Sequence, residues 1–192
     1  ELALGCNPRG SAIKYRPMFY GCGLDYVYIG RNITYDTTSS GGYSPFFNNT
    51  SLRKIVNTAR EKNITANEFE GCTNLQEITL EEGVQTLSEY SFNNCSSLPS
   101  ITLPNSITST IGEYCFSNCT LLSDIKIGTG IPSISDRALM NCSSLTRINI
   151  PNNVDSIKNY VFKGCTALNV VIFEEEDSEL TLGYNNTTTS SS

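Results

Sequence analysis

The chain has 192 residues, of which 39% are hydrophobic and 17% are charged, so it is long enough to bury the core of one domain and too apolar to be disordered. Its formal charge of −6 at pH 7 argues against a nucleic-acid partner, and no apolar run approaches the ~18–20 residues that cross a bilayer. The absence of histidine excludes the Ser-His-Asp and Cys-His catalytic pairs and every metal motif that uses histidine. We therefore expect no enzyme, no cofactor and no metal site.

Residues 1–45 carry a divergent repeat. Leu2 and Leu4 indicate the strand of a coil that the start of the chain cuts open. The next coil shows the apolar series Phe19, Cys22, Leu24, Val27 and Ile29. The polar, Gly-rich stretch from Thr37 to Tyr43 predicts a loop at one edge. Because the sequence begins at Glu1 without a basic and then apolar leader, we expect any signal segment or membrane anchor to lie outside it.

Residues 46–173 repeat one pattern about every 23 residues. The first of these coils has Asn49 where the later coils have cysteine. The later cysteines follow at intervals of 23, 24, 23 and 23 residues: Cys72, Cys95, Cys119, Cys142 and Cys165. Three positions before each stands an apolar residue, in order Phe69, Phe92, Phe116, Leu139 and Phe162. We predict one domain over residues 1–184, followed by a low-complexity tail over 185–192.

Each coil continues with a short segment in which apolar and polar residues alternate. In the coil of Cys72, Ile78 and Leu80 are predicted to face inward, and Glu77 and Thr79 outward. Stacked coils can pair such short strands in parallel at a spacing of ~4.8 Å. Segments such as S-E-Y-S-F predict one helical or 3₁₀ turn on the far side. The pattern predicts an α/β fold, a right-handed solenoid of about seven coils with a parallel sheet on its concave face.

The cysteines favour a buried column of free thiols. Cys22 and the five cysteines in register occupy a core position, and their side chains should all point the same way. The sequence has no C-x-x-C pair, which argues against a zinc site. Cys6 and Cys115 lie off this column, and either could be a free surface thiol. The acidic run that begins at Glu174 lacks the pattern of a calcium loop and favours a solvated face.

The unit F-x-x-C-x-x-L-x-x-I-x-I, in segments such as FNNCSSLPSITLPNSI and LMNCSSLTRINIPNNV, resembles the BspA-type leucine-rich repeat. The resemblance covers most of the chain, and the departures are Asn49 for Cys, Leu139 for Phe and the loop after Tyr35. It implies a leucine-rich-repeat solenoid in a secreted or cell-surface protein, largely of host-associated bacteria and some parasitic protists. Members of that family that are understood act in adhesion or in binding host proteins.

The outward positions of the predicted strands form a candidate partner-binding stripe. Stacked repeats commonly use such an extended face for recognition. The alternative for any single position is a solvated strand residue without a partner. Val170 and Ile172 extend the stripe as an apolar pair, which a cap or a missing segment could also cover. The stripe comprises Tyr26, Tyr28, Lys54, Glu77, Thr79, Thr102, Asp124, Lys126, Arg147 and Asn149.

These observations favour a non-enzymatic protein-binding or adhesion module of a secreted or cell-surface bacterial protein. We expect a monomer whose partner is a protein, such as a host extracellular protein, or a glycan. One alternative is a structural spacer that carries another domain. Another is a carbohydrate-binding protein in which Tyr26 and Tyr28 stack on sugar rings. A glycosidase would need two carboxylates across a cleft, whereas Glu77 and Asp124 are expected two coils apart on one shallow face.

Overall fold

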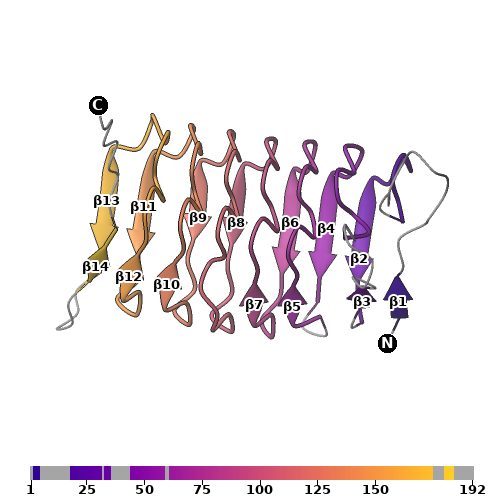
Figure 1. Cartoon of the computed structure of the whole chain (residues 1–192), viewed down its shortest axis with the longest axis horizontal. Helices are drawn as coiled ribbons and strands as arrows, with labels where there is room; N and C mark the ends of the chain where they lie inside the picture. The colour runs from indigo at the N-terminus through magenta and orange to yellow at the C-terminus, as the bar shows by residue number, and fades with distance from the viewer. Residues whose placement is uncertain are drawn as a thin grey trace, which may run out of the picture.

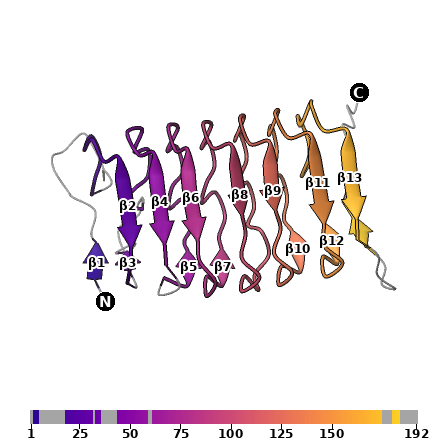
Figure 2. The same cartoon turned by 180° about the vertical axis from the view of Figure 1, so that it is seen from behind.

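The chain forms a parallel-strand solenoid in which successive coils lie side by side from the N-terminal to the C-terminal end (Figures 1 and 2). The computed structural model describes residues 2–4, 18–31, 33–35, 44–58, 61–174 and 180–183. Each coil contributes a first strand to one wall of the solenoid. These first strands are β2 (Tyr26–Ile29), β4 (Lys54–Asn57), β6 (Glu77–Leu80), β8 (Ser100–Thr102), β9 (Asp124–Lys126), β11 (Arg147–Ile150) and β13 (Val170–Phe173).

A second, shorter strand follows the first in most coils and forms a separate row. This row comprises β5 (Asn63–Ile64), β7 (Thr86–Leu87), β10 (Ser133–Ile134), β12 (Ser156–Ile157) and β14 (Thr181–Leu182). Between β7 and β10 the row is reduced to isolated bridges through Ile111. Near the N-terminus, β1 (Leu2–Leu4) pairs in parallel with β3 (Ile33–Tyr35), so the strand predicted at Leu2 and Leu4 is confirmed.

The strand register repeats from coil to coil and sets which side chains face outward. Ile55 pairs with Ile78, and Asn57 with Leu80, in the parallel ladder of β4 and β6. Within β6, Leu80 is buried and Ile78 packs against the core, whereas Glu77 and Thr79 are exposed. A period of two places alternate residues on opposite faces, and the same register in every coil turns this alternation into columns along the solenoid. The predicted inward and outward positions of β6 are therefore confirmed.

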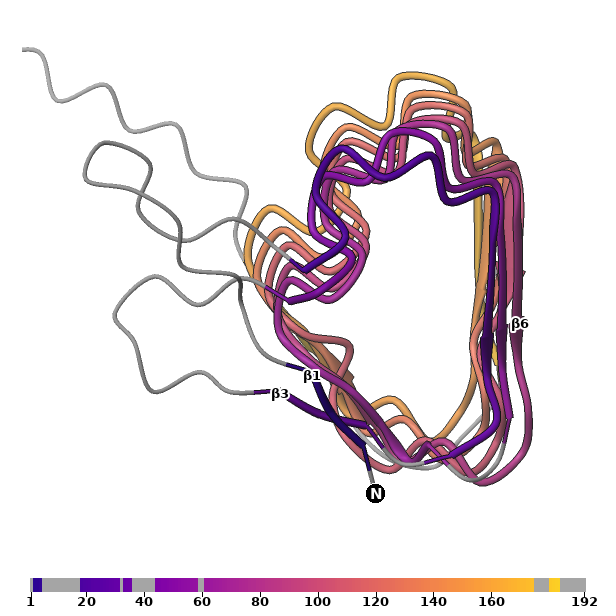
Figure 3. The same ribbon diagram turned by 90° about the vertical axis from the view of Figure 1, so that its right-hand side faces the viewer.

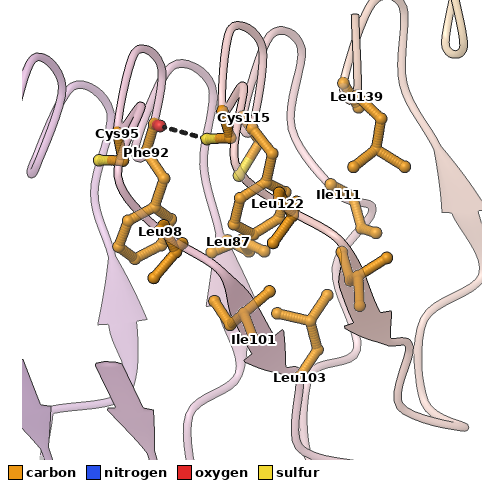
Figure 4. Packing of buried hydrophobic residues seen from close by; sticks show 14 of the residues in the cluster. Leu87, Phe92, Cys95, Leu98, Ile101, Leu103, Ile111, Cys115, Leu122 and Leu139 are labelled. Atoms are coloured by element: carbon orange, nitrogen blue, oxygen red, sulfur yellow. Dashed lines mark hydrogen bonds between the residues drawn. The ribbon is translucent and has the colours of Figure 1, made fainter. Parts of the chain in front are cut away.

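The core is a set of such columns, in which side chains from neighbouring coils meet (Figure 4). Phenylalanine rings form the most regular column. Phe19, Phe46, Phe69, Phe92 and Phe116 stack with centroid separations of 5.4–5.5 Å. Offset stacking at this separation is favourable beyond the burial of apolar area. No coil can bury its apolar side chains alone, so stability comes from this contact between neighbours.

The turns differ from their prediction. The described residues contain no α-helix or 3₁₀-helix, and segments such as S-E-Y-S-F form hydrogen-bonded turns instead. The reason is that Tyr90, in the middle of that segment, has a φ of 56°, which cannot continue a right-handed helical turn. The regular part of the solenoid makes about five turns, so the prediction of seven coils is not confirmed. The right-handed winding and the concave face stay predictions. Within the described part of the chain, no helix is long and apolar enough to span a bilayer.

Candidate functional site

The outward positions of the first strands form a continuous row, which we call the first-strand stripe. It consists of the ten residues predicted from the sequence, from Tyr26 to Asn149, and each of them is exposed. Parallel register places Lys54 between Tyr26 and Glu77, and Thr102 beside Lys126. The structure therefore brings these side chains onto one wall of the solenoid, and their role in binding stays a prediction.

The N-terminal end of the stripe is aromatic. Tyr26 is 50% exposed and Tyr28 is 61% exposed, which is unusual for large rings on a sheet. A side chain at Gly30 would lie 2.6 Å from Cε1 of Tyr28, so glycine leaves room for this ring beside the backbone. Tyrosine supplies a large rigid contact area with a polar tip, and such residues dominate the energetics of protein interfaces.

Next to this aromatic end lies a charged pair. The Lys54 ammonium is 2.6 Å from the Glu77 carboxylate, and this hydrogen bond and charge raise the pKa of Lys54. Both side chains are well exposed, so the pair contributes little to stability. Farther along, the Asn149 amide donates to the Glu174 carboxylate at 2.5 Å. The middle of the stripe is thus polar and of mixed charge, which suits recognition of a specific partner rather than non-specific adsorption.

The cysteine column is structural. Each thiol in register donates to the backbone carbonyl of the preceding coil, for example Cys95 to Phe69 at 3.2 Å and Cys142 to Phe116 at 3.2 Å. Asn49 occupies the same column and repeats this contact, because its amide donates to the Phe19 carbonyl at 3.3 Å. Burial raises the pKa of the Cys72 thiol to about 12, so it is neither a nucleophile nor a metal ligand at neutral pH.

Two cysteines lie elsewhere than predicted. Cys22 was expected in the buried column, but it is exposed, because it lies in the first coil of the column and no described coil packs on its N-terminal side. Cys115 was considered a possible surface thiol, but it is fully buried beside the hydroxyl of Ser91, at 3.2 Å. It directly precedes the core residue Phe116 in a turn that packs inward. The predictions for Cys6, for the loop from Thr37 to Tyr43, for residues 175–179 and for the tail lie outside the described residues.

A second row of side chains was missed by the sequence analysis. It lies in the turns that follow the second strands, on the side of the solenoid opposite the first-strand wall (Figure 3). Its members are Tyr90, Tyr114, Arg137, Tyr160 and Lys163, which we call the aromatic ladder. The available signal was the recurrence of tyrosine two residues before the core phenylalanine, as in E-Y-S-F and E-Y-C-F. The apolar periodicity of the core does not indicate these tyrosines, because they are only half-buried.

Comparison with known proteins decides the family. A model of the "BspA type Leucine rich repeat region" matches residues 42–176 in six copies. The chain belongs to the BspA-type leucine-rich repeat family. The resemblance of its F-x-x-C-x-x-L unit to that family is therefore confirmed. No curated protein matches the chain in sequence.

Solved structures of other leucine-rich repeat proteins share this fold. The leucine-rich repeat protein of T. pallidum has 22% identity and a TM-score of 0.67, and the match covers 94% of this chain and 72% of that one. A leucine-rich cell surface protein of Faecalibacterium prausnitzii has 21% identity and a TM-score of 0.61, with coverage of 91% and 48%. A protein of Bacteroides ovatus has 19% identity and a TM-score of 0.56, with coverage of 95% and 48%. The chain spans about half the length of the latter two.

The BspA-type repeat and its solenoid are typical of non-catalytic proteins. In the described part of the chain, no three Cys, Asp or Glu side chains come together at metal-binding spacing. The hollow at the C-terminal end has a volume of about 280 Å³ and is lined mainly by apolar side chains, among them Val171, Phe173 and Leu182. Val171 and Phe173 share the register of the buried residues Ile148 and Ile150, but they are 40% and 49% exposed, because no described coil packs on that side of β13.

Proposed function

We propose that this chain is a non-enzymatic protein-binding module that acts in adhesion. The BspA-type repeat family and the cell-surface description of the F. prausnitzii protein support this proposal. The parent protein is secreted or held at a bacterial cell surface by an anchor outside this chain. The module acts as a monomer and binds an extracellular protein of the host. The formal charge of −6 agrees with a protein partner rather than a nucleic acid.

The first-strand stripe is the proposed binding face. One observation carries this assignment: all ten side chains predicted from the sequence are exposed on parallel strands in register, with two tyrosines half or more exposed at one end. A spacer needs no exposed tyrosines at adjacent outward positions, since they lower solubility without improving the core. Tyr26 and Tyr28 are the proposed anchors for the partner, and the mixed charges from Lys54 to Arg147 set the orientation in which the partner binds.

A glycan is the second candidate partner, and the same two rings favour it. Tyr26 and Tyr28 point to the same side of β2, and exposed aromatic faces can stack on sugar rings. The two candidates differ in the extent of the contact. A glycan needs only the aromatic end, whereas a protein of ordinary interface size needs the polar middle of the stripe as well.

The test is capture of host extracellular-matrix and serum proteins, and of a glycan array, by the immobilised chain. The Tyr26→Ala, Tyr28→Ala double variant should lose the partner, and Tyr20→Ala should retain it, because Tyr20 is 47% exposed but lies outside the stripe. Loss in Lys126→Ala and Arg147→Ala as well would favour a protein over a glycan. Retention of the partner in every stripe variant would place the binding face outside the stripe, and the absence of any saturable partner would support the spacer.

A further inference from the structure

The aromatic ladder is held by an unusual backbone conformation. Tyr90, Tyr114, Arg137 and Tyr160 have φ values of 56°, 54°, 57° and 59°, a region that costs bulky residues free energy. The first three of these turns are tied to the next coil, as when the Tyr90 amide donates to the Glu113 carbonyl at 2.9 Å. Asn67 occupies the same position one coil earlier, with a φ of 58°. Asparagine adopts this conformation more easily than tyrosine, so stability alone does not explain the rings.

Rings and cations follow one another along this ladder. The Tyr90 and Tyr114 rings stack with centroids 4.8 Å apart. The Arg137 guanidinium then lies 5.4 Å from the Tyr114 centroid and 5.0 Å from that of Tyr160, and Nη1 of Arg137 is 3.5 Å from the Glu113 carboxylate. Arg137 thus shows, within the molecule, how a guanidinium is held at this position. It uses ring faces and one carboxylate.

A groove of about 570 Å³ opens beside the Tyr90 end of the ladder. It lies where the second-strand row is interrupted, because the coil between Cys95 and Cys119 has one extra residue between Ile107 and Ile111. Gly112 lines it and leaves no side chain between the neighbouring coils. Hydroxyl groups line most of the rest, and the only charged lining residues are Glu89 and Glu113, which directly precede Tyr90 and Tyr114. The hydroxyl-bearing lining residues are Thr86, Ser88, Ser109, Thr110 and Ser135.

Two carboxylates at this end of the ladder, those of Glu89 and Glu70, have no ion-pair partner among the described residues. Glu70 is fixed nearby, because Asn93 of the Tyr90 turn donates to it at 2.9 Å. Burial first, and then the charges of Tyr114, Glu113, Glu89 and Glu70, raise the pKa of Tyr90. The Tyr90 end therefore has two carboxylates, Glu70 and Glu89, without a paired cation among the described residues, whereas Glu113 is paired with Arg137.

We propose that this groove binds an arginine side chain from a basic segment of a partner protein. The Glu89 carboxylate pairs with the guanidinium, Glu113 is shared between it and Arg137, and the hydroxyl oxygens of the lining accept from the remaining N–H groups. This site is separate from the first-strand stripe and lies on another side of the solenoid. It gives the module a second point of attachment, which would add avidity to binding at the stripe.

The same features argue against other ligands. The Tyr90 and Tyr114 rings cover one another's faces, which leaves less ring face for a sugar, and a neutral glycan would not use the two carboxylates. A metal ion would need more converging ligands than the described groove provides. A guanidinium uses carboxylates and hydroxyl oxygens together, because all of its hydrogen-bonding groups are donors.

The experiment measures binding of a fluorescein-labelled peptide of alternating Arg and Gly by fluorescence anisotropy, at low salt and at physiological salt. A peptide with citrulline in place of arginine has nearly the same shape without the charge. Glu89→Gln removes the proposed partner of the guanidinium, and Tyr90→Asn replaces the ring with the residue that Asn67 already presents at this position. Glu81→Gln removes one exposed carboxylate elsewhere and is the matched control.

We expect saturable binding of the arginine peptide, weakened about tenfold by Glu89→Gln, and weakened also by added salt and by citrulline, whereas Tyr90→Asn should change it little because Tyr90 does not line the groove. Glu81→Gln and the Tyr26, Tyr28 double variant should bind as the parent does, which separates this site from the stripe. Absence of peptide binding, equal weakening by Glu81→Gln, or equal binding of the citrulline peptide would overturn the proposal. So would a Tyr90-dependent neutral glycan that displaces the peptide.

Discussion

At the scale of single residues, one left-handed backbone position recurs just before the cysteine column. Asn94, Asn118 and Asn141 hold it with φ values of 61°, 61° and 62°, and Gly71 and Gly164 hold it in two other coils. This explains why N-C-[ST] recurs in the sequence. Asparagine and glycine are the residues that enter this conformation most easily, and the amides of Gly71 and of the three asparagines donate to the next coil.

Substitution of Asn94 tests this explanation. Asn94→Gly should change the free energy of unfolding by less than about 0.5 kcal/mol, since glycine stands at this position elsewhere. Asn94→Val should lower it by about 1–3 kcal/mol, because a β-branched residue is strained at positive φ. Urea denaturation followed by circular dichroism gives both values. Equal stability of the two variants would show that the position tolerates any residue.

The buried thiols add a dependence on pH. Burial raises the pKa of Cys72 and of Cys115 from 9.0 to about 12. Each therefore stays protonated in the folded chain when the unfolded chain has already lost the proton. Their contribution to stability is fully present below pH 9 and is lost as pH rises toward about 12.

We expect the free energy of unfolding, measured in urea under reducing conditions, to fall between pH 8.5 and 10.5 by up to about 1.4 kcal/mol per pH unit for each such thiol. The Cys115→Ala variant should show a shallower fall than the parent chain over the same range. Identical slopes would mean that this thiol has the same pKa in both states. The difference between the two proteins cancels the titration of tyrosine and lysine.

At the scale of elements, the first strands are regular except at one position. Asn57 ends β4 where the other strands carry Leu80, Leu103, Ile127 and Ile150. Asn57 is fully buried, and neither side-chain polar atom has a hydrogen-bond partner among the described residues. A buried polar group without a partner costs free energy of folding.

Asn57→Leu should therefore raise the free energy of unfolding by about 1–3 kcal/mol. The melting temperature, measured by scanning calorimetry, should rise accordingly. Thr79→Leu, at an exposed position of the neighbouring strand, is the control and should have little effect on stability. A lower melting temperature for Asn57→Leu would show that the amide is satisfied in solution, for example by water.

The same elements show what the sequence could predict. The alternation in Glu77, Ile78, Thr79 and Leu80 depends only on strand period and burial, so the stripe could be assigned before its structure was known. The aromatic ladder could not, because its geometry depends on positive φ values in turns and on contacts between coils. The prediction of helical turns was wrong for the same reason, because local helix propensity does not indicate which residue, such as Tyr90, has a positive φ.

At the scale of the whole molecule, the solenoid separates the two proposed binding surfaces in space. The first-strand wall carries the stripe, and the turns opposite carry the aromatic ladder and its groove (Figure 3). A stack of similar coils fixes the core and leaves the outward positions free to vary, which is why the family identifies the fold but not the ligand. The two surfaces can therefore be altered independently, and mutations in one should not change binding at the other.

The most direct test of the central claim is hydroxyl-radical footprinting of the chain with and without the protein captured from host matrix or serum. We predict that binding protects Tyr26 and Tyr28, which are exposed in the free chain, and leaves the equally exposed Leu182 reactive, because it lies in β14 of the second-strand row. Protection of Leu182 with continued reactivity of both tyrosines would contradict the assignment of the first-strand stripe as the binding face.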